Sequence, residues 1–520
     1  MTELVPCPTC KTPTSQTLLS EAAWYPYWQR ADGGCPACVQ HNLLATLLNE
    51  GEEAFHASVG AAWSVDHKGA YAALPTPLRL HADPRVQGRG VTIAFLDSGF
   101  YPHPDLVQPN NRIRAWVDAG SPRIQAFEFA NAQTPQWPGW NDAEGWQWHG
   151  MMTSTVAAGN GLNSHGLFAG LASEANVVLI QVREVDGHIS NESITRGLRW
   201  VAEHRERLGI RVVSMSVSGE AIEPLYGNPV DLAVEELVER GISVVAAAGN
   251  DGVRRLIPPA TAPLALTIGG IDDHNSFTNE EVELWHSNYG EASNLMPKPE
   301  LVAPSIWLAT PLLPGSKEAR KAEDLFARIG KGSADLGEQI QKLKLITPYY
   351  QHSDGTSFAA PIVASTVACM LEANPALTPI LIRQILTATA HPVSGAPREL
   401  QGAGAVHPGR AVAAAYAERH DAEALITITP TVTPAGVVFL LHDHGVKSLR
   451  VLGSWNNWLQ PGLAAREREH GLWMTRPLPL PKGQYTYKFF VNDSEWKDDP
   501  ANPEKVPDGH GGLNSVFNVK

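Results

Sequence analysis

Four residues of the chain, taken in sequence order, supply the parts of a nucleophilic site. Asp97 ends the apolar run VTIAFLD, His149 opens the small-residue segment HGMMTSTVAAG, and Asn250 follows the apolar run VVAAAG. Ser357 lies at the turn GTS, which leads into an apolar helical segment. A serine hydroxyl attacks a carbonyl when an imidazole takes its proton and a carboxylate orients that imidazole. An amide donor then stabilises the oxyanion, so these four residue types predict hydrolysis by acyl transfer.

Each of the four residues also has an ordinary structural explanation. Taken singly, Asp97 could be a strand-end cap and His149 a histidine that starts a helix. Asn250 could be a turn residue and Ser357 a helix N-cap. All four in this order, each in a suitable local context, favour the catalytic interpretation over the structural one.

The segment that must position these residues alternates short apolar runs with amphipathic ones. Strands are expected at 91–97, 176–182, 211–216 and 242–247, with helical patterns near 194–201 and 231–240. Alternation of strand and helix predicts a mostly parallel sheet with helices on both faces, the α/β class. Functional groups gather at the carboxyl ends of such strands, where Asp97 and Asn250 are expected.

On these motifs, residues 88 to 415 resemble the subtilisin family of serine peptidases. DSG, HGMMTSTVAAG and GTSFAAP are similar to the family's Asp, His and Ser boxes. The resemblance implies a subtilisin-like fold and a polypeptide substrate. It makes Asp97 the orienting acid, His149 the general base and acid, and Ser357 the nucleophile, with Asn250 as oxyanion donor. It also implies a substrate cleft lined by Ser216, Val217, Ser218 and Gly219.

The segment departs from the family pattern at several positions. Phe358 stands where a methionine is usual after the nucleophile, and Ser218 stands where a glycine is usual, which makes the specificity pocket narrower or more polar. An insert over about 315–347 is predicted to form two short amphipathic helices, with one apolar stripe made of Ala322, Leu325, Phe326 and Ile329. The insert could be a lid over the site or a surface elaboration.

The N-terminal cysteines form two CxxC pairs, which predict a structural zinc module over residues 1–50. Cys7 and Cys10 make the first pair, and Cys35 and Cys38 make the second. Two such pairs complete a tetrahedral Cys₄ site. Disulfides, a redox pair and unrelated thiols are the alternatives. The fifth cysteine, Cys369, is expected to be a buried small hydrophobe.

Beyond about residue 421 the chain changes to short alternating runs separated by Trp, Gly and Pro. Strands are expected at 437–441, 449–455, 485–491 and 514–519, which predict a small antiparallel β-sandwich over 428–520. In the third of these runs, Tyr485, Tyr487 and Phe489 fall on one face and Lys488 points the other way.

This region resembles the glycogen-binding domain of AMP-activated protein kinase beta subunits. The resemblance rests on four motifs in order: GSWNNW, GLW, KGQYTYKFFVNDSEW and GGLNSVFNV. The resemblance implies a partner that is glycogen or another α-glucan. It assigns stacking on sugar rings to Trp458 and Trp496, and hydrogen bonding to Lys488 and Asn514. A structural appendage and a domain that recognises protein are the alternatives.

Composition limits the partners and the compartment. The 520 residues suggest about three domains, which we place at 1–50, 88–420 and 428–520 with a linker at 51–87. Lys and Arg number 40 against 54 Asp and Glu, a net charge of −14, which disfavours nucleic acid and anionic membranes as partners. The start MTELVPCPTC lacks the features of a signal peptide, so a cytoplasmic protein is expected. Calcium is frequent in the resembled family, but no acidic loop here supports assigning it.

The sequence therefore predicts a serine endopeptidase that an α-glucan localises or regulates. The alternatives are a catalytically silent scaffold associated with polysaccharide, and a protease whose C-terminal domain recognises protein.

Overall fold

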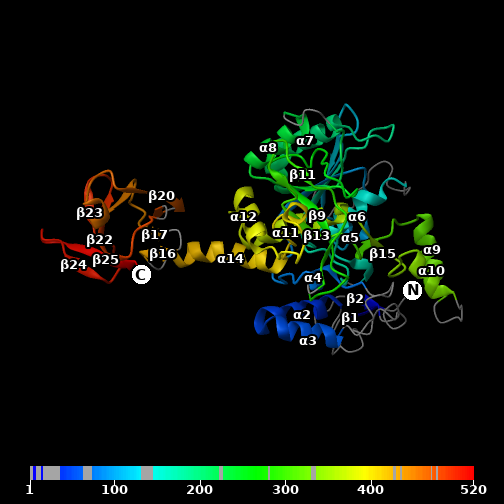
Figure 1. The fold of residues 1–520 in the computed structure, drawn as a ribbon, viewed down its shortest axis with the longest axis horizontal. Helices are drawn as coiled ribbons and strands as arrows, with labels where there is room; N and C mark the ends of the chain where they lie inside the picture. The colour runs from blue at the N-terminus through cyan, green and yellow to red at the C-terminus, as the bar shows by residue number, and fades with distance from the viewer. Residues whose placement is uncertain are drawn as a thin grey trace. The chain divides into compact units, whose positions relative to one another are not determined.

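The computed structural model of the chain describes residues 4–6, 13–15, 36–62, 73–129, 145–164, 166–221, 227–278, 281–328, 335–425, 429–433, 436–469, 471–475 and 478–519. The chain forms two compact units, Met1–Ala415 and Tyr416–Lys520. Helix α14 (Pro408–Leu425) begins in the first unit and ends in the second (Figure 1).

The first unit is built on a mostly parallel sheet, as the sequence predicts. Nine described strands pair in the order β10-β9-β8-β7-β3-β6-β4-β5, with β13 beside β9. The parallel strands are β3 (Thr92–Asp97), β4 (Ile113–Asp118), β6 (Asn176–Gln181), β7 (Ile210–Met215), β8 (Ser243–Ala247), β9 (Leu266–Asp272) and β13 (Leu301–Pro304). The antiparallel edges are β5 (Gln125–Glu128) and β10 (Glu283–Leu284). Strand β3, which carries Asp97, lies between β6 and β7 near the middle.

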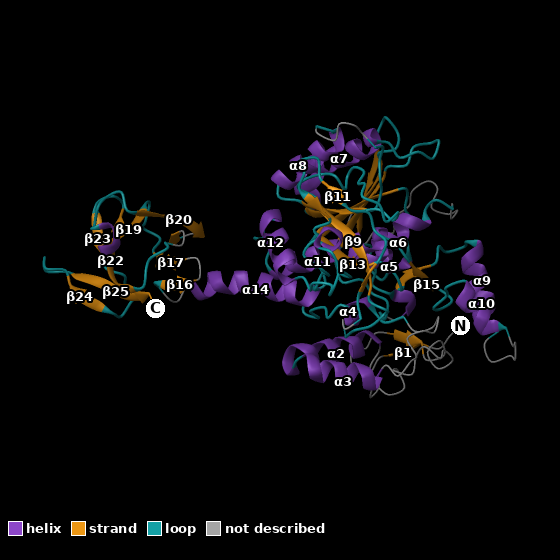
Figure 2. Ribbon diagram, viewed as in Figure 1, coloured by secondary structure: helices purple, strands orange, loops and turns teal. Residues whose placement is uncertain are grey.

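Helices cover both faces of this sheet (Figure 1, Figure 2). On one face α7 (Asn191–Leu208) and α8 (Pro229–Glu239) pack against each other and on the central strands. On the other face α6 (Trp148–Ala158) packs on α11 (Thr356–Ala373), which contacts β7, β8 and β9. Helix α11 is long and apolar enough to cross a membrane, but 89% of it is buried, as in the core helix of a globular unit.

In the segment expected to be a linker, 51–87, the described residues 51–62 and 73–87 instead belong to the first unit. The segment contains α3 (Glu52–Ala62), which follows α2 (Pro36–Glu50), and α4 (Thr76–Arg79). The guanidinium of Arg79 is 1% exposed and bonds the carboxylate of Asp273, with Nε to Oδ2 at 2.6 Å. The expectation rested on the prolines of the segment, but Pro77 lies in the first turn of a short helix, a position where proline is tolerated.

The insert forms the two helices that the sequence predicts. Strands β14 (Leu308–Pro311) and β15 (Tyr350–Ser353) pair antiparallel and frame α9 (Lys317–Phe326) and α10 (Leu336–Lys342). Ala322 and Leu325 of the predicted stripe are buried in a small core with Leu336 and Ile340. Ile329 lies outside the described residues.

The remaining elements of the first unit are short or peripheral. They are β1 (Leu4–Pro6), β2 (Pro13–Ser15), α5 (Pro104–Val107), η1 (Leu162–Ser164), β11 (Gly290–Glu291), β12 (Pro297–Lys298), α12 (Pro379–Thr389) and α13 (Arg398–Gln401). Of the predicted zinc ligands, Cys7, Cys10 and Cys35 lie outside the described residues, and Cys38 is described only by its place in α2. The zinc module stays a prediction.

The second unit is one antiparallel sheet that curls around its own apolar face, whereas a two-sheet sandwich was expected. Its strand order is β18-β21-β20-β19-β22-β25-β24, with β23 beside β22. A separate pair precedes it. The strands are β16 (Thr431–Thr433), β17 (Gly436–Val438), β18 (Leu440–His442), β19 (Leu449–Gly453), β20 (Leu463–Glu469), β21 (Leu472–Thr475), β22 (Gly483–Val491), β23 (Glu495–Lys497), β24 (Lys505–Pro507) and β25 (Leu513–Val519), with the short helix η2 (Ser454–Asn456). The pairing of β19 with β20 joins what would otherwise be two sheets.

Candidate active site and candidate carbohydrate site

Asp97 and His149 form a hydrogen-bonded pair between the end of β3 and the first turn of α6. The distance from His149 Nδ1 to Asp97 Oδ1 is 2.6 Å, and the Asp97 side chain is 1% exposed. Thr153, one turn along α6, donates its hydroxyl to Oδ2 of Asp97 at 2.9 Å, and the backbone N–H of Ser98 donates to Oδ1 at 2.7 Å. These donors fix the carboxylate, which in turn fixes the imidazole and leaves Nε2 for proton transfer.

The environment of His149 favours a base that works near neutral pH. Burial by itself lowers the pKa of His149, but the adjacent charge of Asp97 and the hydrogen bond between them outweigh burial, so the pKa is raised above 6.5. The ring remains 22% exposed and meets the rings of Trp148 and Phe358 at centroid distances of 5.2 and 6.1 Å. A buried partner and a partly open ring are what a general base requires.

Ser357 occupies the first turn of α11, directly before Phe358, whose ring contacts His149. Gly355, which precedes the helix, has φ of +133°, a backbone conformation that side-chain-bearing residues rarely adopt. Ser216, just after β7, donates its hydroxyl to the Ser357 carbonyl at 2.8 Å. The turn thus places Ser357 at a helix N-terminus, where developing negative charge is favoured.

Asn250 is held beside the same turn by its side-chain oxygen. Its Oδ1 accepts hydrogen bonds from the backbone N–H of Thr356 at 3.0 Å and from the Thr356 hydroxyl at 2.7 Å. These bonds assign the other end of the amide, Nδ2, as the free donor. A Cβ added to Gly355 would lie 3.5 Å from that Nδ2, so the donor lies close to the glycine before the nucleophile turn. This arrangement suits an oxyanion donor.

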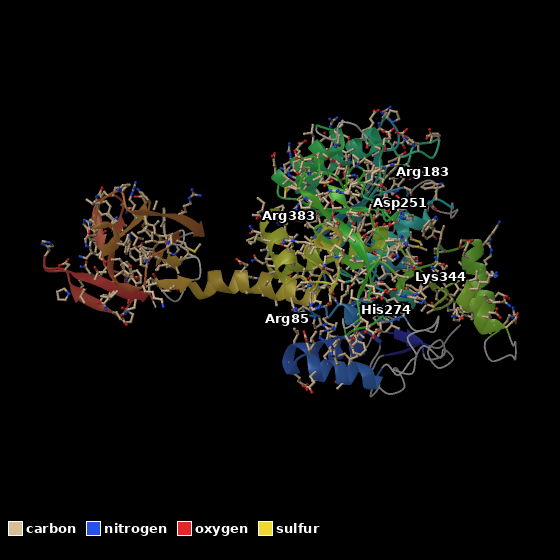
Figure 3. All side chains as sticks on the ribbon, viewed as in Figure 1. Arg85, Arg183, Asp251, His274, Lys344 and Arg383 are labelled. Atoms are coloured by element: carbon tan, nitrogen blue, oxygen red, sulfur yellow. The ribbon has the colours of Figure 1, made fainter. Side chains whose placement is uncertain are left out.

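The loop after Asn250 is fixed by further side chains. His286 donates from Nδ1 to the Asn250 carbonyl at 2.9 Å. The carboxylate of Asp251, labelled in Figure 3, accepts a 3.3 Å hydrogen bond from the amide of Asn288, whose oxygen accepts from the Asp251 backbone at 2.9 Å. The predicted donor therefore comes from a braced loop, which keeps it oriented before substrate arrives.

The predicted cleft residues follow β7 and contact the nucleophile turn through Ser216. Ser216 and Val217 are each 8% exposed, and Ser218 is exposed. A side chain at Gly219 would require Asn191 to shift, because an added Cβ would lie 2.1 Å from its Oδ1. These positions are compatible with the predicted cleft, whose substrate preference stays a prediction.

Sequence reasoning did not single out the residues that orient the site. Thr153 and Thr356, which hold Asp97 and Asn250, each stand inside a motif used to find the catalytic groups. For Thr153 the spacing from His149 is the signal that could have identified it, because it lies one helical turn later, on the same face of α6. A threonine in a small-residue helix is otherwise unremarkable, so only the contact reveals its role.

The insert contributes a wall to a cavity of about 630 Å³ beside the candidate site. Trp148 and Met152 of α6 line it, together with Leu312, Leu313 and the start of α9. Trp148 is 43% exposed, and its ring lies edge-to-face with that of His149. The insert therefore shares a cavity with a neighbour of the candidate catalytic histidine, while a lid function remains a prediction.

Cys369 is buried in α11, as predicted. Burial raises the pKa of its thiol well above the usual range, so it stays protonated and chemically inert.

The second unit brings the predicted aromatic residues together on the outer face of β22. Lys488 and Phe490 alternate with the buried Tyr487, so they face away from the core. The ring of Trp496 lies 4.9 Å from Phe490 and 6.2 Å from Trp458, at 61° to the latter. Trp496 is 43% exposed. The two tryptophans thus form a partly exposed apolar platform.

The predicted polar residues lie close to this platform. The Lys488 ammonium contacts the Asp508 carboxylate at 2.5 Å, and this bond, with the backbone N–H groups of His510 and Gly512, holds the pKa of Asp508 well below its usual range. Asn514 precedes Ser515 of β25, which pairs with the residue before Lys488. Lys488 and Asn514 are therefore the residues that follow the last paired position of β22 and β25, and Lys488 is two residues along β22 from Phe490.

Comparisons with known proteins agree with this geometry. Residues 88–404, more than half of the chain, match the model of the Subtilase family, and residues 437–520 match the family described as the glycogen recognition site of AMP-activated protein kinase. Serine protease AprX of Bacillus subtilis is 28% identical over 333 residues, 62% of this chain and 66% of that protein. The match thus spans just under two thirds of AprX.

Two further proteins are similar to the first unit. Subtilisin BL of Lederbergia lenta is 28% identical over 303 residues, 58% of this chain and 84% of that enzyme. A solved protease of Pseudoalteromonas arctica has a TM-score of 0.45 at 22% identity, over 66% of this chain and 94% of its own, which adds nothing to the assignment. The match to the family model is sufficient: the chain belongs to the subtilase family, the subtilisin-like serine proteases.

Proposed function

We propose that the chain is a serine endopeptidase that cleaves polypeptides through an acyl-enzyme on Ser357. The observation that carries the proposal is the 2.6 Å pair of buried Asp97 and partly open His149, next to the helix turn that bears the serine. A pair of this kind supplies the base that a serine hydroxyl needs. A structural role alone gives no reason for leaving the imidazole open to solvent.

The reaction follows from the roles of these side chains. His149 takes the hydroxyl proton as Ser357 Oγ bonds to the peptide carbonyl carbon, and Asp97 stabilises the imidazolium that forms. Asn250 Nδ2 donates to the oxyanion. His149 then gives the proton to the leaving amine, the C–N bond breaks, and a water molecule deprotonated by His149 releases the acyl group from the serine.

The test is covalent labelling of the folded full-length chain with a fluorophosphonate, which reacts with an activated serine. We expect one labelled site, and peptide mapping should place it on the segment that contains Ser357. Absence of labelling in a chain with an intact circular-dichroism spectrum would support the alternative of a catalytically silent scaffold.

Removing the amide donor should slow the chemical step without weakening substrate binding. We expect Asn250→Leu to lower kcat by about 10²–10³-fold with little change in KM, the usual cost of one oxyanion donor. Steady-state kinetics on a fluorogenic peptide measures both. Thr356→Val is the matched control: it removes one of the two bonds that hold Oδ1 and keeps the donor, so its effect should be smaller. A KM effect alone for Asn250→Leu would contradict the assignment.

We propose further that the second unit binds α-glucan and so localises the protease to it. Sugar rings present apolar C–H faces, which suit the platform of Trp458 and Trp496, while Lys488 and Asn514 offer polar groups for the hydroxyls. The match of residues 437–520 to a glycogen recognition family supports the choice of ligand.

Truncating the platform should release the chain from glycogen. We expect Trp458→Ala and Trp496→Ala each to weaken retention on glycogen or amylose by roughly 10-fold or more, since aromatic anchor residues cost about 2 kcal/mol on truncation. Leu459→Ala, at an exposed apolar neighbour of Trp458, is the control and should be retained like the wild type. Equal retention of all variants would eliminate stacking and favour a domain that recognises protein.

A further inference from the structure

A second cluster of chemically capable side chains lies in the first unit and takes no part in the acyl-transfer site. Glu52 begins α3, His81 follows α4, and His407 stands just before α14. Each of the three residues has one potential ligand atom within 4.8 Å of those of the other two. Carboxylate oxygen and imidazole nitrogen are the ligands that Zn²⁺ and similar ions prefer.

His81 is the residue that points to a ligand. It is 3% exposed, and its Nε2 lies 2.6 Å from the carbonyl oxygen of Phe277. Because a carbonyl only accepts, Nε2 carries the proton and Nδ1 presents a lone pair. That Nδ1 is buried and has no hydrogen-bond partner among the described residues. A buried unpaired nitrogen is costly, whereas a histidine that bonds a backbone carbonyl through one nitrogen and a metal through the other is a common arrangement.

His407 is also available as a ligand. Its ring lies 5.5 Å from that of His81, at 76°. Its Nδ1 accepts one long hydrogen bond, 3.3 Å, from the backbone N–H of Arg410. A metal ion on Nδ1 would displace that bond, and since Arg410 is exposed, water can then replace the acceptor for its N–H, whereas an ion on Nε2 would leave the bond in place. Burial lowers the pKa of His81, and that of His407 to about 4, so both rings are neutral at neutral pH.

Glu52 supplies the negative charge and the approach from solvent. Its Oε1 lies 3.3 Å from Nη2 of Arg410, and both side chains are about half exposed. Either carboxylate oxygen can turn toward an ion, because the exposed side chain is free to rotate. The positive charge of Arg410 would repel a bound cation at this position. Because the Arg410 side chain is half exposed, it can turn away into water.

We propose that Glu52, His81 and His407 bind a divalent transition-metal ion of the Zn²⁺ class, with water as a fourth ligand. Zinc bonds of about 2.0–2.2 Å place tetrahedral ligand atoms roughly 3.4 Å apart. The ligand atoms of the three residues lie within 4.8 Å of one another, so their side chains need to move closer by at most about 1.4 Å to bind an ion. The ion would tie α3 to the segment after α4 and to the start of α14. Its ligands are different residues from the four cysteines of the predicted zinc module and from the proposed catalytic residues.

The test uses the full-length chain, stripped with EDTA and titrated with Co²⁺. Cobalt on nitrogen and oxygen ligands gives visible ligand-field bands, and cobalt in the predicted Cys₄ module would add visible bands of its own together with a near-ultraviolet thiolate band. The signal of the proposed site is therefore the visible difference spectrum between wild type and a variant of the site, since both carry the same cysteines. We expect one such site per chain, absent in His81→Ala. If His81→Ala does not fold, Glu52→Gln, an exposed change, should still weaken cobalt binding by roughly 10-fold or more.

Two further variants make the test specific. Arg410→Gln removes the opposing positive charge and should bind cobalt more tightly than wild type, an effect that a merely structural cluster would not give. His188→Gln, at an exposed histidine that bonds Glu220, is the matched control and should bind as wild type does. Identical cobalt titrations of wild type and Glu52→Gln, or no visible difference spectrum between wild type and a folded His81→Ala, would overturn the proposal.

Discussion

The Ser357→Ala variant should lose peptide hydrolysis by about 10⁶-fold while keeping its fold. The hydroxyl is the nucleophile of the proposed reaction, and loss of a triad nucleophile leaves only binding and oxyanion stabilisation to catalyse attack by water. The change removes one oxygen atom at the first turn of α11, where Ser216 bonds the backbone carbonyl rather than the hydroxyl. Turnover of a fluorogenic peptide at saturating substrate measures the loss.

Ser365→Ala is the matched control for this variant. Ser365 lies two turns further along the same helix, and its hydroxyl bonds only the Ile362 carbonyl within the helix. It should retain full turnover, with a thermal midpoint near that of wild type. Hydrolysis by Ser357→Ala at more than a hundredth of the wild-type rate would mean that another nucleophile performs the reaction.

The Asp97→Asn variant should lower kcat by about 10⁴-fold and move the acidic limb of the pH profile to lower pH. An asparagine cannot stabilise the imidazolium, and its amide can donate to Nδ1 and so favour the wrong tautomer. In the wild-type chain Asp97 raises the pKa of His149 above 6.5 despite burial. Activity of wild type should therefore decline as pH falls through that raised value, because the base becomes protonated.

The direction of the shift follows from what remains after the substitution. Burial, which lowers the pKa of His149, stays in place, while the carboxylate charge is lost. The stabilisation that this ion pair gives the folded state is present below the unfolded histidine pKa and is lost as pH rises through the raised folded value. Asp97→Asn should therefore be less stable than wild type chiefly at acidic pH. Chemical denaturation at pH 5 and pH 8 measures this difference.

Asp118→Asn is the matched control, because Asp118 also ends a parallel strand but bonds the loop N–H groups of Gly120 and Ser121. It should leave kcat and its pH profile unchanged. An acidic limb at the same pH in Asp97→Asn and wild type would show that another group governs the profile.

Local sequence determined much of the fold and the candidate site. The apolar run before Asp97 is short and rich in β-branched residues, which favours the buried strand that the structure has. The small residues after His149 permit the close packing of α6 on α11. In β22 the alternation of Tyr487 and Phe489 with Lys488 predicts the buried and outer faces that the structure has. Each of these features depends on residues that are close to one another in the sequence, within one or two helical turns or a few positions along a strand.

The tertiary structure decided what depends on distant residues. Arg79 is buried because Asp273, 194 positions away, neutralises it, so a proline-containing segment expected to be a linker became part of the core. The β19–β20 pairing made one curled sheet where alternation alone predicted two. Glu52, His81 and His407, which are far apart in the sequence, come together only once α3 and the start of α14 are packed. Periodicity records which face of an element is buried, but which elements meet is set by the packing of the whole chain.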